Sequence, residues 1–414
     1  MRIAYLLKKF PRLSETFVLT EMLGQEALGA RLHVFSRRTP DDEPRHAELA
    51  RLRAAVELLP GGGRIDAWAE LFAAGADPGE LLEHARRAHQ RYAHLGLEKF
   101  GALLGEALWL LRRTRELEIE HVHAHFATDS ALVAMLLREL GGPPFSLTAH
   151  AKDIYRASVD FGRLSELLGA SAFTVTVCDA NVEFLRARLE PRAAQRVRRL
   201  YNGIDIESFA APRAEPREAR RVLSVGRLVE KKGFGILLDA LELLVQRGVD
   251  FQATIVGDGE DRARLEARVR GGALAPRVQL TGAQTQAQVR EQFARASLFA
   301  LPCRIGDDGN RDALPTVLLE AQAAGVACVS TPVGGVAEIL DGGRAGALAP
   351  VDDPQTLAAT LERLLDDAGE RERLAREASR VVRERFDVRR QARVLHSWFE
   401  ASVAAERERC ASRS

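Results

Sequence analysis

The chain has 414 residues, more than one hydrophobic core usually covers, so its length predicts two domains. Hydrophobic residues make up 46% of it and charged residues 28%, which is typical of a soluble globular protein. A net charge of +1 gives the whole chain no attraction for nucleic acid, so we expect no nucleic-acid partner.

Cysteine spacing and hydropathy indicate the compartment. The four cysteines lie far apart without metal-type spacing, which predicts reduced thiols, and Cys178 and Cys328 sit in apolar runs typical of a core. The apolar run of residues 3–7 is too short for a signal sequence, so we expect no export by that route. No stretch of about 18 uninterrupted apolar residues occurs, and we expect no membrane-spanning helix. These patterns predict a cytoplasmic protein, with attachment to the inner face of the cell membrane left open.

Short β-rich runs alternate with helical patterns along the whole chain. In the first half these runs are residues 3–7, 31–35, 121–125, 145–148 and 173–177. In the second half they are residues 221–225, 251–256, 278–280, 298–301 and 326–330. Such alternation predicts parallel sheets covered by helices on both faces, and therefore an α/β protein with two doubly wound, Rossmann-like domains.

The domain boundary is predicted from a loss of pattern. Residues 205–217 lose periodicity and contain Pro212 and Pro216, as an exposed linker should. We predict an N-terminal domain of residues 1–205, a C-terminal domain of residues 206–384, and a helix of about residues 385–410 that crosses back to the first domain. Sheets of this kind bind ligands beyond the carboxyl ends of their strands, so two such edges are expected to face each other across a cleft.

The most informative segment is residues 310–331, where Asp312 and Glu320 lie on either side of the turn Leu314-Pro315-Thr316. Pro315 suits the first turn of a helix, and the amides that follow have no intrahelical partner, so they can meet a bound anion. The two carboxylates can accept hydrogen bonds from sugar hydroxyls. This combination indicates a sugar joined to a phosphate, and the alternative is an ordinary strand, loop and helix with surface acids.

A second candidate site is the basic loop after the first strand of the second domain. Arg227 and Lys232 can neutralise a diphosphate from this loop, and glycines at 226 and 233 allow close backbone approach. A solvated basic loop is the alternative. Gly257 ends the next strand in Val-Gly-Asp-Gly, either lining the same cleft or making a tight turn. Neither loop has the dinucleotide fingerprint Gly-x-Gly-x-x-Gly, which disfavours a nicotinamide enzyme.

Histidines gather in the first domain. His121, His123 and His125 alternate along one strand and so share one face of it. We expect no metal there, because side chains two apart on a strand point in parallel instead of converging on one ion, and we expect His125 to line the cleft at most.

Residues 80–115 combine leucines, Phe100 and Trp109 with seven basic side chains. Two interpretations stay open. A basic amphipathic surface attracts anionic lipid headgroups, and simple helices packing on the first sheet explain the same pattern.

The order of the motifs resembles that of the family-4 retaining glycosyltransferases of the GT-B class. The resemblance covers nearly the whole chain, through Tyr201-Asn-Gly-Ile-Asp205, the loop 226–233, and residues 256–259, 278–282, 312–321, 331–335 and 338. Residues 10–17, 123–126 and 148–153 resemble its exopolysaccharide branch, which includes colanic-acid and amylovoran transferases.

The resemblance implies roles for the donor side of the cleft. Glu320 would bind the ribose hydroxyls, and Arg227 and Lys232 would bind the diphosphate. Leu280 and Gly282 would lie at the edge of the base.

The remaining roles lie around the transferred sugar. Asp312 would contact the sugar, although the family usually has glutamate there, which predicts an altered donor preference. His150 would lie near the reacting centre, with a satisfied core histidine as the alternative. A family Gly-Gly pair is replaced by residues 14–16, so Ser14 would donate to the phosphate, cap a helix beginning at Glu15, or do both.

The resemblance implies metal-independent, retaining transfer of a hexosyl group from a nucleoside-diphosphate sugar, with UDP favoured and no cofactor. The acceptor would be a saccharide or lipid-linked saccharide in exopolysaccharide or cell-surface glycan synthesis. Three alternatives remain: a sugar-nucleotide epimerase of the same architecture, a non-catalytic sugar-nucleotide binder, and a hydride-transferring oxidoreductase.

Overall fold

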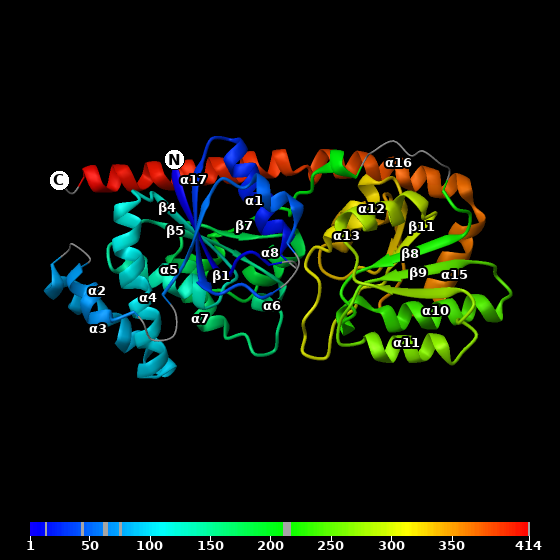
Figure 1. The fold of residues 1–414 in the computed structure, drawn as a ribbon, viewed down its shortest axis with the longest axis horizontal. Coiled ribbons are helices and arrows are strands. Elements are labelled where there is room, and N and C mark those ends of the chain that lie inside the picture. The colour runs from blue at the N-terminus through cyan, green and yellow to red at the C-terminus, as the bar shows by residue number, and fades with distance from the viewer. Residues whose placement is uncertain (13–14, 43–44, 61–64, 74–76, 210–216, 413–414) are drawn as a thin grey trace.

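Two α/β domains lie side by side in the computed structural model, which describes residues 1–12, 15–42, 45–60, 65–73, 77–209 and 217–412 (Figure 1). Each domain is a wholly parallel sheet between helices. The two-domain Rossmann-like architecture expected from the alternating pattern is therefore confirmed.

The first domain has a seven-stranded sheet in the order β3-β2-β1-β4-β5-β6-β7. Its strands are β1 Arg2–Lys9, β2 Arg31–Arg38, β3 Ala55–Leu58, β4 His121–His125, β5 Phe145–Ala149, β6 Thr174–Thr176 and β7 Val197–Arg199. Its α-helices are α1 Thr16–Ala27, α2 Ala67–Ala73, α3 Pro78–Tyr92, α4 Leu97–Glu116, α5 Asp129–Glu139, α6 Ala151–Ile154, α7 Phe161–Ala170, α8 Asp179–Arg186 and α9 Pro191–Ala194, with short 3-10 turns η1 Ala47–Arg51 and η2 Ala93–Leu95.

The second domain has a six-stranded sheet in the order β10-β9-β8-β11-β12-β13. Its strands are β8 Arg221–Val225, β9 Gln252–Val256, β10 Val278–Gly282, β11 Leu298–Leu301, β12 Ala327–Ser330 and β13 Ala347–Leu348. Its helices are α10 Phe234–Gln246, α11 Arg262–Arg270, α12 Gln286–Arg295, α13 Thr316–Ala323, α14 Val336–Ile339, α15 Pro354–Asp366 and α16 Ala368–Arg385, with 3-10 turns η4 Glu230–Lys232 and η5 Asp341–Gly343.

The central strands explain why the sequence folds this way. Every residue of β4, β5, β11 and β12 is buried, as in a parallel sheet covered on both faces. Each of the ten β-rich runs found in the sequence overlaps one strand. Cys178 and Cys328 are fully buried, as predicted, and all four cysteines are free thiols.

Two segments connect the domains. The chain leaves the first domain through Tyr201 and the 3-10 turn η3 Ile206–Ser208, and it returns through α17 Val388–Ala411, which lies along α1 (Figure 1). The two crossings touch, because Ile204 forms a parallel bridge with Asp387. Phe399 of α17 is buried, with its ring against those of His121 and Phe173, so the returning helix is part of the first domain's core.

The helices of residues 80–115 mostly pack on the first domain. Phe100 and Trp109 are buried, and many basic side chains are paired with acids, as Arg112 is with Glu70 at 3.0 Å and Arg113 with Glu57 at 3.0 Å. Three large apolar side chains of α2, α3 and α4 remain exposed: Phe72, Leu82 and Leu97. Among the described residues, no helix combines the length and apolarity needed to cross a membrane.

Candidate active site

A buried charge cluster lies at the amino end of α13. The carboxylate of Asp312, only 8% exposed, is 2.9 Å from Lys231 Nζ and 2.5 Å from Lys232 Nζ. Burial alone would raise the pKa of Asp312, but the two ammonium groups outweigh it and hold that pKa well below its usual range. The structure therefore brings together two predicted residues, Asp312 and Lys232, from loops 80 positions apart. Lys231 is a third member that the sequence did not single out.

The loop after β8 adds an exposed cation to the buried pair. Arg227 is exposed, and within the described residues its guanidinium makes no hydrogen bond or ion pair. Burial and, to a smaller extent, Arg227 lower the pKa of Lys232, but the charge and hydrogen bond of Asp312, together with Cys303, outweigh them, so this pKa is raised overall. Arg227 and Lys232 thus present two positive groups at the same edge of the sheet, as their predicted diphosphate role requires.

The glycines of these loops serve close packing of protein backbone. A Cβ on Gly233, whose φ is +70°, would lie 1.8 Å from the carbonyl oxygen of Pro302, and one on Gly226 would make only ordinary contacts. The sequence predicted that both glycines allow the backbone to approach a diphosphate. For Gly233 the structure gives a different reason, which is its close contact with the Pro302 backbone. Gly257 meets Gly226 instead: its added Cβ would lie 1.9 Å from the Gly226 oxygen.

The predicted base-side residues gather around the same loops. The Gly257 N–H donates to the carbonyl oxygen of Gly282 at 2.9 Å, and Leu280 is partly buried two positions before Gly282 on β10. Arg262 approaches Gly282 from α11. Gly257, Leu280 and Gly282 therefore form one edge of the second domain.

The helix α13 begins one residue later than expected. Pro315 is its N-cap, with φ −70° and ψ 100°, and Thr316 is the first helical residue. Leu314 and Pro315 are buried beneath the loop, and Gly335 N–H donates to the Ala313 oxygen at 2.6 Å. The Leu318 N–H donates to the Pro315 oxygen at 3.0 Å, whereas the N–H groups of Thr316 and Val317 have no acceptor among the described residues and are left for a bound anion.

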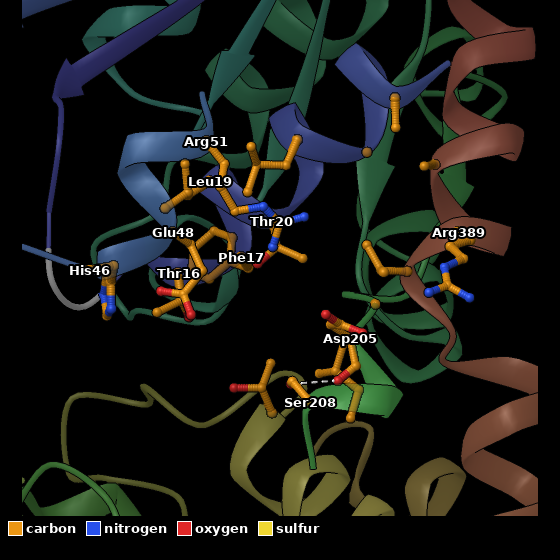
Figure 2. Close-up of a pocket in the computed structure, with 18 of the residues that line it drawn as sticks. Thr16, Phe17, Leu19, Thr20, His46, Glu48, Arg51, Asp205, Ser208 and Arg389 are labelled. Atoms are coloured by element: carbon orange, nitrogen blue, oxygen red, sulfur yellow. Dashed lines mark hydrogen bonds between the residues drawn. The ribbon is translucent and has the colours of Figure 1, made fainter. Parts of the chain in front are cut away.

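An interdomain pocket of about 390 Å³ opens beside α13. Figure 2 shows Thr16 and Phe17 of α1 on one side and Asp205 and Ser208 of the domain junction on the other, with Arg389 of α17 at the rim. Its wall in the second domain contains Thr316 and Glu320. Two of the residues predicted to meet a donor, Thr316 and Glu320, therefore border this interdomain pocket.

The Glu320 backbone oxygen accepts a hydrogen bond from the Ala324 N–H, but the Glu320 carboxylate makes no hydrogen bond or ion pair with any described residue. Burial raises the pKa of its carboxyl to about 7, although Lys232 and Arg290 pull it downward. A carboxylate whose burial is not compensated inside the protein is suited to accept hydrogen bonds from ligand hydroxyls, which would restore its charged form.

Donor binding is expected to depend on pH through Glu320. With a pKa of about 7 in the free protein, the ionised fraction of Glu320 falls about tenfold between pH 8 and pH 6. Hydroxyl donors favour the ionised form, so the affinity for a nucleoside-diphosphate sugar should fall by about the same factor over that range. Calorimetric titration at several pH values measures it. Glu320→Gln is the control, since its weaker affinity should change little with pH, and an equal slope in both proteins would contradict the assignment.

The first domain supplies an aromatic and histidine wall. His150, the N-cap of α6, is 8% exposed, and its ring packs against Phe17 and Phe126 at centroid distances of 4.8 and 4.4 Å. Burial, helped by His125 and Lys152, lowers the pKa of His150 well below its usual value, so the ring is neutral.

One expectation for this wall needs correction, and another keeps to its limit. His125 was expected to line the cleft at most, and it is only 1% exposed and hydrogen-bonded inside the domain. The first helix begins at Thr16 with Glu15 as its N-cap, one residue later than predicted, and Ser14 lies outside the described residues. His121, His123 and His125 do share one face of β4, as predicted, since all three contact rings from that side.

A loop of the second domain reaches across to the first. The Asp308 oxygen accepts from Ala157 N–H at 3.1 Å, and the Asp308 carboxylate is 3.3 Å from the Arg156 guanidinium. The guanidinium of Arg311 lies over the ring of Tyr155, 4.3 Å from its centroid. Residues 308–311 thus hold the loop before Asp312 against the first domain.

A second interdomain contact involves Glu338 of α14. Its carboxylate accepts from the backbone N–H groups of Asp179 at 2.9 Å and Ala180 at 3.0 Å, and from the Tyr201 hydroxyl at 3.0 Å. The side chain therefore caps the amino end of α8 from the other domain.

Removing this cap should loosen the domain contact. Glu338→Ala leaves three donors without their acceptor, so the free energy of unfolding should fall by about 2 kcal/mol in urea denaturation. Tyr201→Phe removes only one of the three hydrogen bonds and should cost about half as much. Equal stability of Glu338→Ala and the wild-type protein would show that the contact contributes nothing.

Two family models match the chain, one to each domain. A model described as Glycosyltransferase Family 4 matches residues 14–208, and one described as Glycosyl transferases group 1 matches residues 219–367. The chain belongs to the family-4 glycosyltransferases. It is thus an enzyme that takes a sugar from a nucleotide-sugar donor to a saccharide acceptor.

Relatives of this glycosyltransferase match over most of their length. The amylovoran biosynthesis glycosyltransferase AmsK of Erwinia amylovora is 28% identical, covering 88% of this chain and 90% of its own. The putative colanic acid biosynthesis glycosyltransferase WcaL of Escherichia coli is 27% identical, covering 87% and 90%. The resemblance to the exopolysaccharide branch is confirmed by these relatives.

The glycosyltransferase also shares its fold with solved GT-B structures. HepE of Anabaena, crystallised in complex with UDP and glucose, has a TM-score of 0.69 at 18% identity and covers 96% of this chain and 98% of its own. A glycosyltransferase of Rickettsia africae has a TM-score of 0.70 at 14% identity, with 97% and 98% covered. These likenesses confirm the predicted GT-B architecture.

Proposed function

We propose that this enzyme transfers a hexosyl group, with retention of anomeric configuration, from a UDP-sugar to a saccharide or lipid-linked saccharide in exopolysaccharide synthesis. The observation that supports the proposal is the charge cluster before α13, where Lys232 pairs with Asp312 at 2.5 Å and Arg227 lies close enough to affect the pKa of Lys232. The names of AmsK and WcaL support the pathway class, and the UDP complexes of HepE support the base.

The chemistry follows from where charge develops. As the bond from the anomeric carbon to the donor diphosphate breaks, positive charge grows on the sugar and negative charge on the β-phosphate. Lys232, Arg227 and the free amides of α13 stabilise the phosphate without having to reorganise. Asp312 keeps Lys232 charged despite its burial, and we assign its carboxylate to accept a hydrogen bond from a hydroxyl of the transferred sugar.

No protein nucleophile enters this proposal. The acceptor hydroxyl attacks from the face that the diphosphate leaves, and the departing phosphate oxygen takes its proton, so that one glycosidic bond forms as one breaks. The fixed cations replace a divalent metal in this scheme, so transfer should proceed undiminished in EDTA. We assign His150, whose ring packs against the pocket residue Phe17, to accept a hydrogen bond from the transferred sugar.

Product analysis tests the proposal and separates it from its rivals. The enzyme is incubated with UDP-hexoses with and without saccharide acceptors, and the products are characterised by mass spectrometry and by NMR of the anomeric centre. A retained linkage formed only with an acceptor supports the proposal, and an inverted linkage contradicts it. A changed donor sugar without any acceptor would identify an epimerase, and tight binding without turnover would identify a non-catalytic binder.

A thermal-shift panel of nucleotide sugars identifies the base. A ligand present at 100 times its dissociation constant adds about 2.7 kcal/mol to stability.

Attachment to the inner face of the membrane rests on the exposed side chains of Phe72, Leu82 and Leu97 and on the basic helices beside them. Flotation with anionic liposomes tests it, and recovery of the protein only in the unbound fraction would exclude it.

A further inference from the structure

Three titratable side chains from different elements meet inside the first domain. Glu21 comes from α1, His125 from the end of β4, and His150 from the end of β5. Glu21 Oε1 is 3.3 Å from His125 Nε2, and His125 Nδ1 is 3.2 Å from His150 Nε2. A continuous hydrogen-bonded chain therefore runs from a carboxylate to the histidine at the cleft wall.

The first link fixes the protonation of His125. Glu21 is ionised, because His125, His123 and Tyr5 lower the pKa of its carboxyl in spite of burial. An ionised carboxylate only accepts hydrogen bonds, so His125 Nε2 must carry a proton and donate a hydrogen bond to Glu21. The Tyr5 hydroxyl donates to the same Glu21 oxygen at 2.9 Å.

The hydrogen bond between His125 and His150 then determines which nitrogen of His150 carries the proton. When neutral His125 carries its proton on Nε2, its Nδ1 is bare and can only accept. His150 must then donate through Nε2–H, and its own Nδ1 is left without a proton. Without Glu21 the opposite arrangement becomes equally good, with His125 donating through Nδ1 and His150 protonated on Nδ1.

A metal ion is the rival explanation for the same residues. Ligand atoms of Glu21, His123 and His125 lie within 4.8 Å of one another. The nitrogens of His123, however, already contact hydroxyls, with Nδ1 2.8 Å from Ser146 Oγ and Nε2 3.0 Å from Thr148 Oγ1. Hydrogen bonds between the residues themselves account for the cluster.

We propose that Glu21 and His125 are positioning residues, which hold His150 in the tautomer whose Nδ1 accepts a hydrogen bond from the transferred sugar. The proposal rests on the proposed function, because it assigns His150 to the sugar in that reaction. A carboxylate that fixes a histidine tautomer has a large effect elsewhere in enzymology, since the wrong tautomer presents a donor where an acceptor is needed.

The tautomer is measured directly on the free protein. In ¹⁵N-labelled enzyme, protonated and bare imidazole nitrogens have well separated chemical shifts, and His150 is assigned by comparison with His150→Gln. The wild-type protein should show His150 protonated on Nε2. A proton on Nδ1 would overturn the proposal whether or not any variant folds, and this result does not depend on which sugar is transferred.

Variants connect the tautomer to turnover. Glu21→Gln should shift His150 toward the Nδ1-protonated form and lower kcat at least about tenfold, with the donor KM within about twofold of wild type. Tyr5→Phe is the matched control, since it removes a hydrogen bond from the same Glu21 oxygen and should leave tautomer and kcat unchanged. A loss of kcat with an unchanged tautomer would show a merely structural role and overturn the proposal.

Metal analysis completes the test. Stoichiometric zinc in the wild-type protein that disappears in Glu21→Gln would establish a metal site and overturn the hydrogen-bonded chain. If the wild-type enzyme transfers no sugar at all, the proposed function fails, whereas the tautomer measurement still decides how Glu21 acts on His150.

Discussion

Lys232→Ala is expected to lower kcat/KM for donor turnover by about a thousandfold. The Lys232 side chain is largely buried, and its ion pair with Asp312 maintains its charge. Arg227 lies close enough to affect the pKa of Lys232. Such a fixed charge acts most strongly when negative charge develops on the leaving diphosphate, so the loss should fall mainly on kcat. Steady-state kinetics with a saturating acceptor separates kcat from KM.

Lys231→Ala is the matched control for Lys232→Ala. It removes the same charge from the other oxygen of Asp312, 2.9 Å away, but Lys231 is not one of the residues assigned to the diphosphate. Its effect should be at least about tenfold smaller. Equal losses in the two variants would mean that the lysines act only by holding Asp312, and no loss in either would remove the diphosphate assignment.

Gly257→Ala is expected to lower the free energy of unfolding by about 3 kcal/mol and to weaken donor binding strongly. Two effects add. The backbone of Gly257 has φ +147°, which L side chains rarely adopt, and a Cβ there would lie 1.9 Å from the backbone oxygen of Gly226. Relief of that clash must move the loop that carries Arg227. Urea unfolding and calorimetric titration measure the two consequences.

Gly248→Ala separates the two effects on stability. Gly248 also has a positive φ, +74°, but nothing lies within 4 Å of its added Cβ. Its substitution should therefore cost only about 1 kcal/mol, the conformational part alone, and leave donor binding intact. Equal costs at both positions would show that the contact between Gly257 and Gly226 is easily relieved.

How deeply each strand is buried explains whether the sequence pattern predicted it. The predicted strands lie mostly within the two sheets, where both faces are covered and apolar runs are unbroken. The three unpredicted strands, β3, β7 and β13, lie at sheet edges and carry exposed or partly exposed residues. They pair through backbone hydrogen bonds, which leave no periodic signal in such short segments.

Single residues of the proposed donor site could be predicted from the sequence, but the ion pairs between them could not. Arg227 and Lys232 were identified because their loop follows a strand, and strand ends converge at one edge of a parallel sheet, whereas Asp312 and Glu320 were identified because they flank a turn that opens a helix. The ion pairs of Asp312 depend on loop geometry across 80 residues, so no local pattern revealed Lys231.

Glu21 left a signal that the sequence interpretation did not use. It stands in the apolar pattern of α1, between Val18 and Met22, both fully buried. An isolated acid on the buried face of a helix requires a partner, and the histidines of β4 were the available candidates. What the sequence did not contain was the direction of those side chains across the sheet.

The joined crossings between the domains limit how the cleft can open. The Ile204 N–H donates to the Phe386 oxygen at 2.9 Å, the Val388 N–H donates to the Ile204 oxygen at 3.1 Å, and a Cβ on Gly203 would lie 2.5 Å from Val388 Cα, so the outgoing and returning chains are joined beside Gly203. We therefore expect the two domains to rotate about this hinge and not to slide apart. Opening of the cleft at Asp308 then requires its contacts with Ala157 and Arg156 to break.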